Sequence, residues 1–566
     1  MSNVAGKAYG MNVITPMKPW KTWFNTLIFR VSRLLPETLG GLLGLSLIHF
    51  ARWVMIRRKQ WPDLGQGPQT LQNDYMLFCS NFNGTWDQYI DAFSDGIPNG
   101  LDMFWYASTK YPQSIPITPF KDYILHNQID TTYYYNATPG SAQRDIKSAL
   151  KLYQTLRALA ERHPKLSPQL FAEAYRAALV EVQNCLGSPG YAPVASNDTR
   201  EADWNRGLFV DRTQDALQEQ PLSLPPTVAA PPGKAEGRSD FTTSFDGGHY
   251  FLTVLAPVRN TRLTERSGVR CSAVQRLRDV LATLPTALQS QATEDIGLNS
   301  PFARNKRTHL ARFVVIDDVP YNGRESDDAL VTAACKIRPV TPQPQDRLSC
   351  PYLLFAADFD AKDGSAETLR GYLGELWATM EPELRAIFGN CFGFERVGNA
   401  ASFCDYVMAC EVETTMPFND YWVGKPPLKS RLLSALLPAI ILLVPLALFS
   451  IFLVFLLVFG NYRLCDMIGR FWAILSGVTV ALYVAYRRVM AVGAEPFPAA
   501  PDSDLPAVLK ALYLQRHFIR HFIATQGADD ATLYDAFGRF ADEHQPGNIQ
   551  QPTQAPGVIG LREQTP

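Results

Sequence analysis

Two short stretches of this 566-residue chain are nearly the same, and they decide its fold. The first, "IHFARWVMIR", runs from Ile48 to Arg57, and the second, "THLARFVVID", runs from Thr308 to Asp317. From the histidine to the first valine, four of six positions are identical: His, Ala, Arg and Val. Both stretches are rich in β-branched and aromatic residues, which indicates strands. A strand that occurs twice in one chain suggests a repeated unit.

Three further matches occur in the same order along the chain, as a duplication requires. They are "VITPMK" (Val13–Lys18) with "VLAPVR" (Val254–Arg259), "YMLFCSNFN" (Tyr75–Asn83) with "YLLFAADFD" (Tyr352–Asp360), and "FKDYILHNQIDTT" (Phe120–Thr132) with "FCDYVMACEVETT" (Phe403–Thr415). The number of residues that separates the two matched segments increases from one match to the next along the chain. This growth is expected if the second copy has longer loops.

The patterns within each copy predict a β-α-β-β-α-β order, the ferredoxin-like unit. In the second copy we expect strands at 249–259, 309–316, 352–359 and 403–414, and helices at 272–288 and 365–380. The strands are apolar on both faces, whereas a sheet with one face in water should alternate. The sequence therefore predicts an α+β protein in which two ferredoxin-like βαββαβ repeats pack sheet to sheet as a fused α+β barrel.

This arrangement resembles the dimeric α+β barrel superfamily, over about residues 10–135 and 249–422. Topology and duplication carry the resemblance. The superfamily includes dye-decolourising peroxidases, chlorite-dismutase-like haem proteins, cofactor-free monooxygenases and small-ligand sensors. The GxxDG signature of the peroxidases is absent, because "FDGG" (Phe245–Gly248) and "KDG" (Lys362–Gly364) lack the leading glycine. No haem-site residue is therefore carried over. The cofactor stays unknown, with haem as an open alternative.

A long apolar stretch predicts membrane insertion. No charged residue occurs between Arg431 and Arg463, a stretch longer than the ~20 residues that span a bilayer. A second apolar run, Phe471–Tyr486, is shorter, and Arg470 and Arg487 at its ends can extend toward the interface. We expect a transmembrane helical hairpin at 430–488, with a re-entrant or interfacial second segment as the alternative.

Basic residues flank the predicted hairpin on the side of the large domains. Lys425, Lys429 and Arg431 precede it, and Arg487 and Arg488 follow it, which by the positive-inside rule places both flanks in the cytoplasm. No secretory signal is recognised at the N-terminus. We expect an integral membrane protein, in the inner or plasma membrane if the source is bacterial, with its large domains in the cytoplasm. The apolar segment at 21–45 either lies on the membrane surface or forms a core helix.

The whole chain divides into seven predicted segments. They are a first ferredoxin-like repeat at 10–140, a helical pair at 141–190, a disordered Pro-rich linker at 191–248, a second ferredoxin-like repeat at 249–424, the transmembrane hairpin at 430–488, C-terminal helices at 502–545, and a disordered tail at 546–566. The linker is predicted from "QPLSLPPTVAAPPGKAEGRSD", and the tail from its Pro and Gln content.

Two His-x-x-Arg pairs are the candidate ligand-binding residues: His49 with Arg52, and His309 with Arg312. Imidazole and guanidinium groups suit a haem or an anionic ligand. Residues i and i+3 of a regular strand face opposite sides, so each pair can line one pocket only if a bulge intervenes. The alternative is a structural role. Catalytic residues remain unknown, and no metal site is predicted.

Composition narrows the partners. The net charge is −1 with no basic excess, which argues against nucleic acid. The expected partners are the lipid bilayer and a small apolar molecule. The sequence favours a membrane-anchored cytoplasmic α+β barrel protein that binds a small apolar or lipid-like ligand. One alternative is a membrane-associated oxidoreductase of the peroxidase or monooxygenase type, with or without haem. The other is a non-catalytic scaffold.

Overall fold

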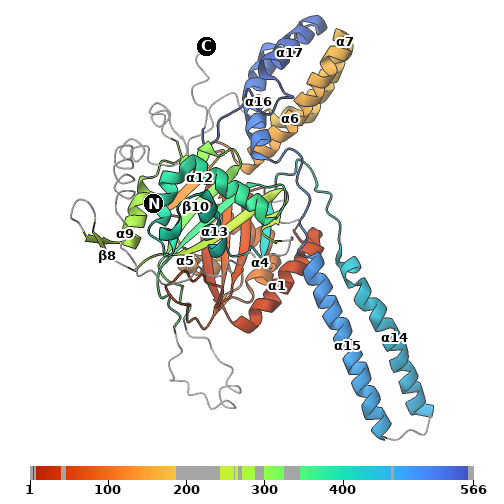
Figure 1. Ribbon diagram of the computed structural model, residues 1–566. Helices are drawn as coiled ribbons and strands as arrows, with labels where there is room; N and C mark the ends of the chain where they lie inside the picture. The colour runs from red at the N-terminus through yellow and green to blue at the C-terminus, as the bar shows by residue number, and fades with distance from the viewer. Residues whose placement is uncertain are drawn as a thin grey trace.

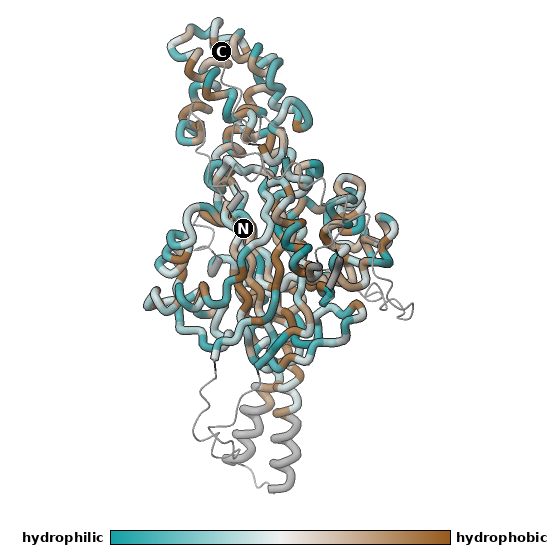
Figure 2. Tube along the Cα trace, turned by 90° about the vertical axis from the view of Figure 1, so that its left-hand side faces the viewer, coloured by the Kyte–Doolittle hydropathy of each residue, from teal (hydrophilic) through white to brown (hydrophobic). Residues whose placement is uncertain are grey.

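Two antiparallel sheets form the centre of the molecule, helices cover them, and two long helices project from one end (Figure 1). The computed structural model describes residues 4–5, 8–39, 46–186, 242–260, 262–264, 270–286, 299–323, 345–459 and 464–558. The predicted α+β class is confirmed. Figure 2 shows apolar residues concentrated along the strands in the middle of the body.

Each sheet has five strands, and the two orders follow the same scheme. The first runs β1 (Val4–Ala5), β2 (Ala8–Met17), β4 (Asp74–Asn83), β3 (Ile48–Ile56) and β12 (Met416–Asn419). The second runs β6 (Phe245–Asp246), β7 (His249–Pro257), β11 (Tyr352–Asp360), β10 (Thr308–Ile316) and β5 (Tyr133–Asn136). The last strand of each sheet comes from the other part of the chain. A small separate hairpin joins β8 (Arg262–Thr264) to β9 (Arg270–Ser272).

The exchanged strands pair in matching registers. Met416 of β12 lies opposite Trp53, and Tyr133 of β5 lies opposite Phe313, the position that aligns with Trp53 in the repeated phrase. Before crossing, each segment also touches the first strand of its own half. Gln128 forms a bridge with Val13, and Glu411 forms a bridge with Val254.

The first three predicted strands of each half lie close to the expected positions, but the predicted fourth strands are wrong. Residues 403–414 mostly belong to α13 (Ala400–Cys410), and residues 120–132 mostly belong to α5 (Ile117–Asn127). The buried side chains of α13 recur at helical spacing, at Phe403, Tyr406, Val407 and Cys410. The strands that follow these helices, β5 and β12, have four residues each.

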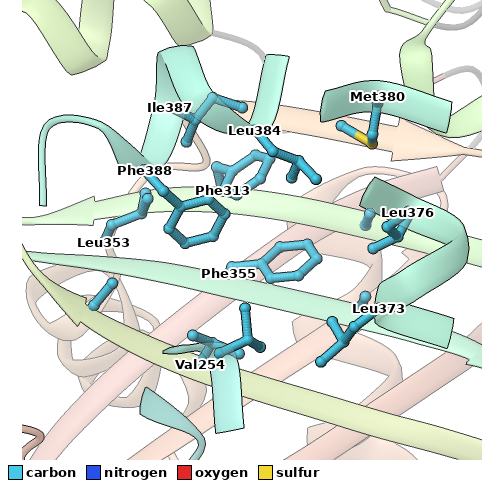
Figure 3. Packing of buried hydrophobic residues seen from close by; sticks show 14 of the residues in the cluster. Val254, Phe313, Leu353, Phe355, Leu373, Leu376, Met380, Leu384, Ile387 and Phe388 are labelled. Atoms are coloured by element: carbon cyan, nitrogen blue, oxygen red, sulfur yellow. The ribbon is translucent and has the colours of Figure 1, made fainter. Parts of the chain in front are cut away.

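Helices cover the outer face of each sheet. The second sheet packs against α9 (Ala273–Thr283), α12 (Ala366–Phe388) and α13. Figure 3 shows Phe313 and Phe355 of this sheet beside Phe388 of α12. Helix α12 begins after Ser365, as predicted, and is kinked at Met380 ahead of Pro382. The first sheet packs against α1 (Pro19–Leu34), α3 (Trp86–Gly96), α4 (Pro98–Trp105) and α5.

The segments predicted as a helical pair and as C-terminal helices pack together. Helices α6 (Gln143–Arg162), α7 (Pro168–Val182), α16 (Leu505–Ala524) and α17 (Asp530–His544) share an apolar cluster and project from the body (Figure 1).

The outcome for the predicted linker and tail is mixed. Most of the linker, 187–241, lies outside the described residues, but residues 242–248 include β6 and are largely buried. The tail prediction is wrong for 546–558. Lys510 Nζ donates to the carbonyl of Pro552 (2.8 Å), and the Gly557 N–H donates to the carbonyl of Ala137 (2.7 Å). Residues 559–566 lie outside the described part.

Two helices, α14 (Leu432–Phe459) and α15 (Leu464–Val492), extend from the end of the body opposite the four-helix group (Figures 1 and 2). They lie side by side, with Gly477 of α15 against Leu446 of α14. Among the described residues, Ile474–Val492 is long and apolar enough to cross a membrane by length and composition. Helix α1 packs at their base, where Leu34 meets Val489 and Val492.

Candidate functional site

The seam between the two sheets has an apolar region and a polar region. The apolar region is one packed cluster with side chains from both sheets, including Ile14, Val54, Leu77, Leu255, Val314 and Leu354. Burial of both strand faces explains why the strands lack an alternating pattern. The polar region holds Arg52 and Arg312, whereas His49 and His309 lie near the starts of β3 and β10, at shifts in strand register.

Arg52 and Arg312 cross the seam in opposite directions. Arg52 of β3 donates to the carbonyl of Leu252, to the Thr253 hydroxyl (3.2 Å) and to the Asp358 carboxylate. Arg312 of β10 makes the corresponding set of contacts with the first sheet. It donates to the carbonyls of Met11 (2.9 Å) and Ser80 (3.1 Å) and to the side chains of Asn12 (2.8 Å) and Asn81.

Asn81 and Asp358 connect these two sets of contacts. The Asn81 amide donates to Asp358 Oδ2 (3.1 Å), and its oxygen accepts from the Tyr134 hydroxyl (2.8 Å). Burial raises the pKa of Asp358, while the neighbouring guanidinium groups of Arg52 and Arg312 act to lower it. The guanidinium groups already bind protein acceptors. This geometry gives both arginines a structural role, because each one ties one sheet to the other.

The strand ladder is irregular at both histidines. The pairing register shifts between Ile48 and Phe50, and again between Thr308 and Leu310, so each shift spans a histidine. This irregularity is the bulge that the sequence reasoning required. It leaves His309 against the ring of Phe50 (centroids 5.3 Å apart), and Phe50 in turn contacts Phe251, the ring that lies under Arg52.

His309 lies in a cluster with a histidine that the sequence reasoning missed. His309 Nε2 is 2.7 Å from Asp360 Oδ1, and His249 Nε2 is 3.5 Å from the same oxygen. His249 and Asp360 are direct partners in the pairing of β7 with β11. The ligand atoms of these three residues lie within 4.8 Å of one another, so they could hold a metal ion. The sequence predicted no metal site, because only the strand order brings these three strand ends together.

His49 has a different environment. Its Nδ1 lies 3.1 Å from the hydroxyl of Tyr421. Burial lowers the pKa of His49 to about 4, although a hydrogen bond with Asn83 acts in the opposite direction. The residues at the positions that match His249 and Asp360 are Ala8 and Asn83, which are likewise direct partners in the pairing of β2 with β4. The first half therefore has no equivalent metal-binding set.

These residues do not fit a haem. An axial histidine must face a cavity wide enough for a porphyrin. His49 and His309 are instead buried against Phe50 and Tyr421, with ring centroids 5.3 to 6.2 Å apart for His309–Phe50, His309–Tyr421 and His49–Tyr421. No step is therefore derived through haem.

Comparison with known proteins places the chain in no group. It matches no family model, no curated protein and no solved structure. The class that the fold and the seam define is an α+β protein of two antiparallel sheets that exchange their last strands.

Proposed function

We propose that this chain is a membrane-anchored α+β barrel protein that binds a small apolar or lipid-like ligand where its body meets the membrane. The observation that carries the anchoring is the exposed apolar surface of α14 and α15. It includes Leu433 (72% exposed) and Leu482 (61% exposed), together with Leu437, Ile441, Val444, Leu448 and Val480. Apolar surface of this extent is unfavourable in water and favourable in lipid.

The lengths of both helices support a pair of spans. Helix α14 has 28 residues and α15 has 29, which corresponds to about 42 Å or more at ~1.5 Å per residue, against a hydrocarbon core of ~30 Å. Pro438 and Pro445 lie inside α14, where a membrane helix tolerates them. The excess of flanking basic residues supports a cytoplasmic body.

Helix α1 lies outside the hairpin, and its residues also support a body that sits on the membrane surface. Its exposed face carries Trp20, Trp23 and Phe24, and the Lys21 ammonium lies 5.6 Å from the Trp20 ring. Its other end packs on the base of α14 and α15 through Leu34. Aromatic residues beside lysine are typical of the membrane–water interface. We therefore place α1 along the membrane surface, one of the two alternatives that the sequence left open.

For the body we propose a duplicated βαββαβ unit whose fourth strands have been exchanged between the copies. Matched strand orders, matched registers of β5 and β12, and the corresponding contacts of Arg52 and Arg312 support this origin. An exchange of equivalent edge strands pairs the outer side of β3 with β12 and the outer side of β10 with β5.

A pocket at the membrane end of the body supports the ligand proposal. Its lining is mostly apolar, with two polar side chains: Pro417, Phe418, Trp422, Leu428, Phe497, Pro498, Asp246 and Asn419. Leu428 precedes α14, and Phe497 follows α15. A mostly apolar lining with few polar groups is typical of small-molecule sites. The seam is filled by a packed apolar cluster, so we place the proposed site at this pocket and away from the His and Arg pairs.

The anchoring is tested by washing membranes that contain the full chain with alkaline carbonate. We expect the protein to stay in the pellet. The double variant Leu442→Arg/Val480→Arg should move to the supernatant, because a charge at the centre of a span costs about 2.5–3.5 kcal/mol on insertion scales. The matched control is Leu170→Arg, at an exposed leucine of α7, which should stay in the pellet. Release of the unaltered protein would rule out an integral anchor.

The pocket is tested with a photoreactive fatty acid added to the full chain in lipid nanodiscs. We expect crosslinks in the peptide that contains Phe418 and Trp422, and loss of most of that labelling in Trp422→Arg. Tyr321→Arg, at an exposed aromatic residue outside the pocket, is the control and should label like the unaltered protein. Labelling restricted to α14 and α15 would mean that the probe reports the bilayer alone, and the scaffold alternative would then take the place of the ligand proposal.

A further inference from the structure

We infer that His249, His309 and Asp360 form a binding site for a divalent first-row transition-metal ion, with Zn²⁺ as the simplest occupant. Two imidazoles and one carboxylate form a ligand set typical of such ions. Their ligand atoms lie within 4.8 Å of one another. Ligands ~2.0–2.1 Å from a tetrahedral ion are about 3.3 Å apart. The 3.5 Å between His249 Nε2 and Asp360 Oδ1 matches this spacing.

His309 needs the larger adjustment. Its Nε2 now makes a 2.7 Å hydrogen bond with Asp360 Oδ1, and that bond would open by about half an ångström to admit the ion. A further oxygen is available nearby, because the carbonyl of Ser503 lies 3.2 Å from His249 Nε2. The Asp360 side chain is 16% exposed, whereas both histidines are buried, so the ion and a water ligand would enter past the carboxylate.

Neighbouring groups already hold two of the ligands in place, as the surroundings of metal sites do. The Asn419 amide lies 2.7 Å from His249 Nδ1, and the Leu505 N–H donates to Asp360 Oδ2 (2.8 Å). With the ion on Nε2, Nδ1 carries the proton and the Asn419 amide presents its oxygen to it. This reversal needs only a half turn of a side chain whose O and N have nearly the same shape.

Comparison with the first half of the molecule indicates that the fold does not require these ligands. Its matching positions hold Ala8, His49 and Asn83, and the Ala8–Asn83 pairing repeats the His249–Asp360 pairing. The same sheet edge is thus built without the second histidine and without the carboxylate. A fold requirement alone would not explain two buried histidines around one carboxylate at only one of the two edges.

The ligand set also selects the class of ion. Ca²⁺ takes six to eight oxygen ligands, whereas this site supplies two nitrogens. Imidazole and carboxylate together suit Zn²⁺, Fe²⁺ and Mn²⁺. Phe50 closes one side of the site, with its ring centroid 5.1 Å from that of His249 and 5.3 Å from that of His309.

The experiment titrates the full chain, purified in detergent and stripped with a chelator, with ZnCl₂ and counts bound metal by mass spectrometry. We expect one Zn²⁺ per chain. Asp360→Asn and His309→Gln should bind at least tenfold more weakly, and Asn419→Ala should lose about 10- to 100-fold in affinity. The matched control is His49→Gln, which alters the corresponding histidine of the first half and should bind like the unaltered protein.

Thermal melting separates loss of the site from loss of the fold. Zn²⁺ should raise the Tm of the unaltered protein and of His49→Gln by mass action, and should leave the Tm of Asp360→Asn unchanged. A stoichiometry far below one would overturn the inference. So would zinc that persists in both Asp360→Asn and His309→Gln, because it would then bind elsewhere. If a ligand variant fails to fold, Asn419→Ala decides the question, since Asn419 lies outside the ligand set.

Discussion

The two sheets have the same backbone arrangement where β3 begins and where β10 begins, but the side chains at these two places differ. At the β10 edge, His249 and His309 surround the Asp360 carboxylate. At the β3 edge, the matching residues are Ala8, His49 and Asn83. Strand pairing and bulge are the same at both edges. The comparison teaches that both sheets form with the bulge and one histidine, and that the second histidine and the carboxylate are not needed for this backbone.

The arginines of the seam differ in the same way. Arg52 faces the carboxylate of Asp358, whereas Arg312 faces the amide of Asn81. A buried charge that loses its only counter-ion costs more than one that loses a neutral acceptor. The two seam contacts should therefore respond very differently to the same truncation.

The largest expected effect is on the charged contact. Asp358→Ala leaves the Arg52 guanidinium buried without an anion and should lower the free energy of unfolding by about 3–5 kcal/mol. Asn81→Ala should cost about 1–3 kcal/mol, because other acceptors of Arg312 remain. Denaturant midpoints of the full chain in detergent measure both. Asp405→Ala, in the exposed ion pair with Arg370, is the control and should cost less than about 1 kcal/mol. Equal losses for Asp358→Ala and Asn81→Ala would show that charge does not distinguish the contacts.

A smaller effect depends on pH. Burial lowers the pKa values of His49, His249 and His521 to about 4, from 6.5. Between pH 4 and pH 6.5 the unfolded chain binds more protons than the folded one. The contribution of these histidines to the free energy of unfolding is therefore full above pH 6.5 and falls as the pH drops toward 4. Each histidine contributes about 1.4 kcal/mol per pH unit within that window. Unfolding should be followed from pH 7 to 4.5 with a chelator present.

His49→Gln sharpens the comparison between the two edges. It should remove about a third of this pH dependence, because His249 and His521 still titrate. A variant with the full slope would mean that His49 is protonated as easily in the folded chain as in the unfolded one. His126, an exposed histidine on α5, gives the control variant His126→Gln, which should keep the slope.

The smallest expected effect concerns two helix caps: that of α3, which follows β4, and that of α12, which follows β11. Thr85 caps α3 by accepting from the Gln88 N–H (3.2 Å), and Ser365 caps α12 by accepting from the Thr368 N–H (3.1 Å). Thr85→Ala and Ser365→Ala should each cost about 1 kcal/mol. A shift in Tm measures both, with Thr85→Ser as the conservative control. A loss as large as that of Asp358→Ala would mean that a cap supports more than its own helix.

The first three strands of each half and the start of α12 could be predicted from the sequence, because local patterns determine them. Ser365 was identified as the start of a helix, and the repeated phrase was identified as a strand. The fourth strands were wrong because aligned apolar strings were interpreted as strands, although Phe403, Tyr406 and Val407 have helical spacing. The exchange of β5 and β12 could not be predicted, since the partner of a four-residue strand lies far away in sequence.

The candidate site was predicted in part for the same reason. Arg52 and Arg312 cross the seam, and all four candidate residues are buried. His249 was missed because it occupies the first position of its strand, and only the completed sheet brings it to Asp360. A search for ionisable residues at the ends of the three central strands of each half would have found it.

The exchange of the last strands also sets an order of events during synthesis. A growing chain that has made β2, β3 and β4 still lacks the edge strand of that sheet, which arrives only with Met416–Asn419. The first sheet therefore stays open until nearly the whole body has been translated, and an open strand edge is prone to wrong pairing. Helix α14 begins at Leu432, whereas that edge strand ends at Asn419. Completion of the first sheet and synthesis of the apolar helix α14 thus follow each other closely during translation.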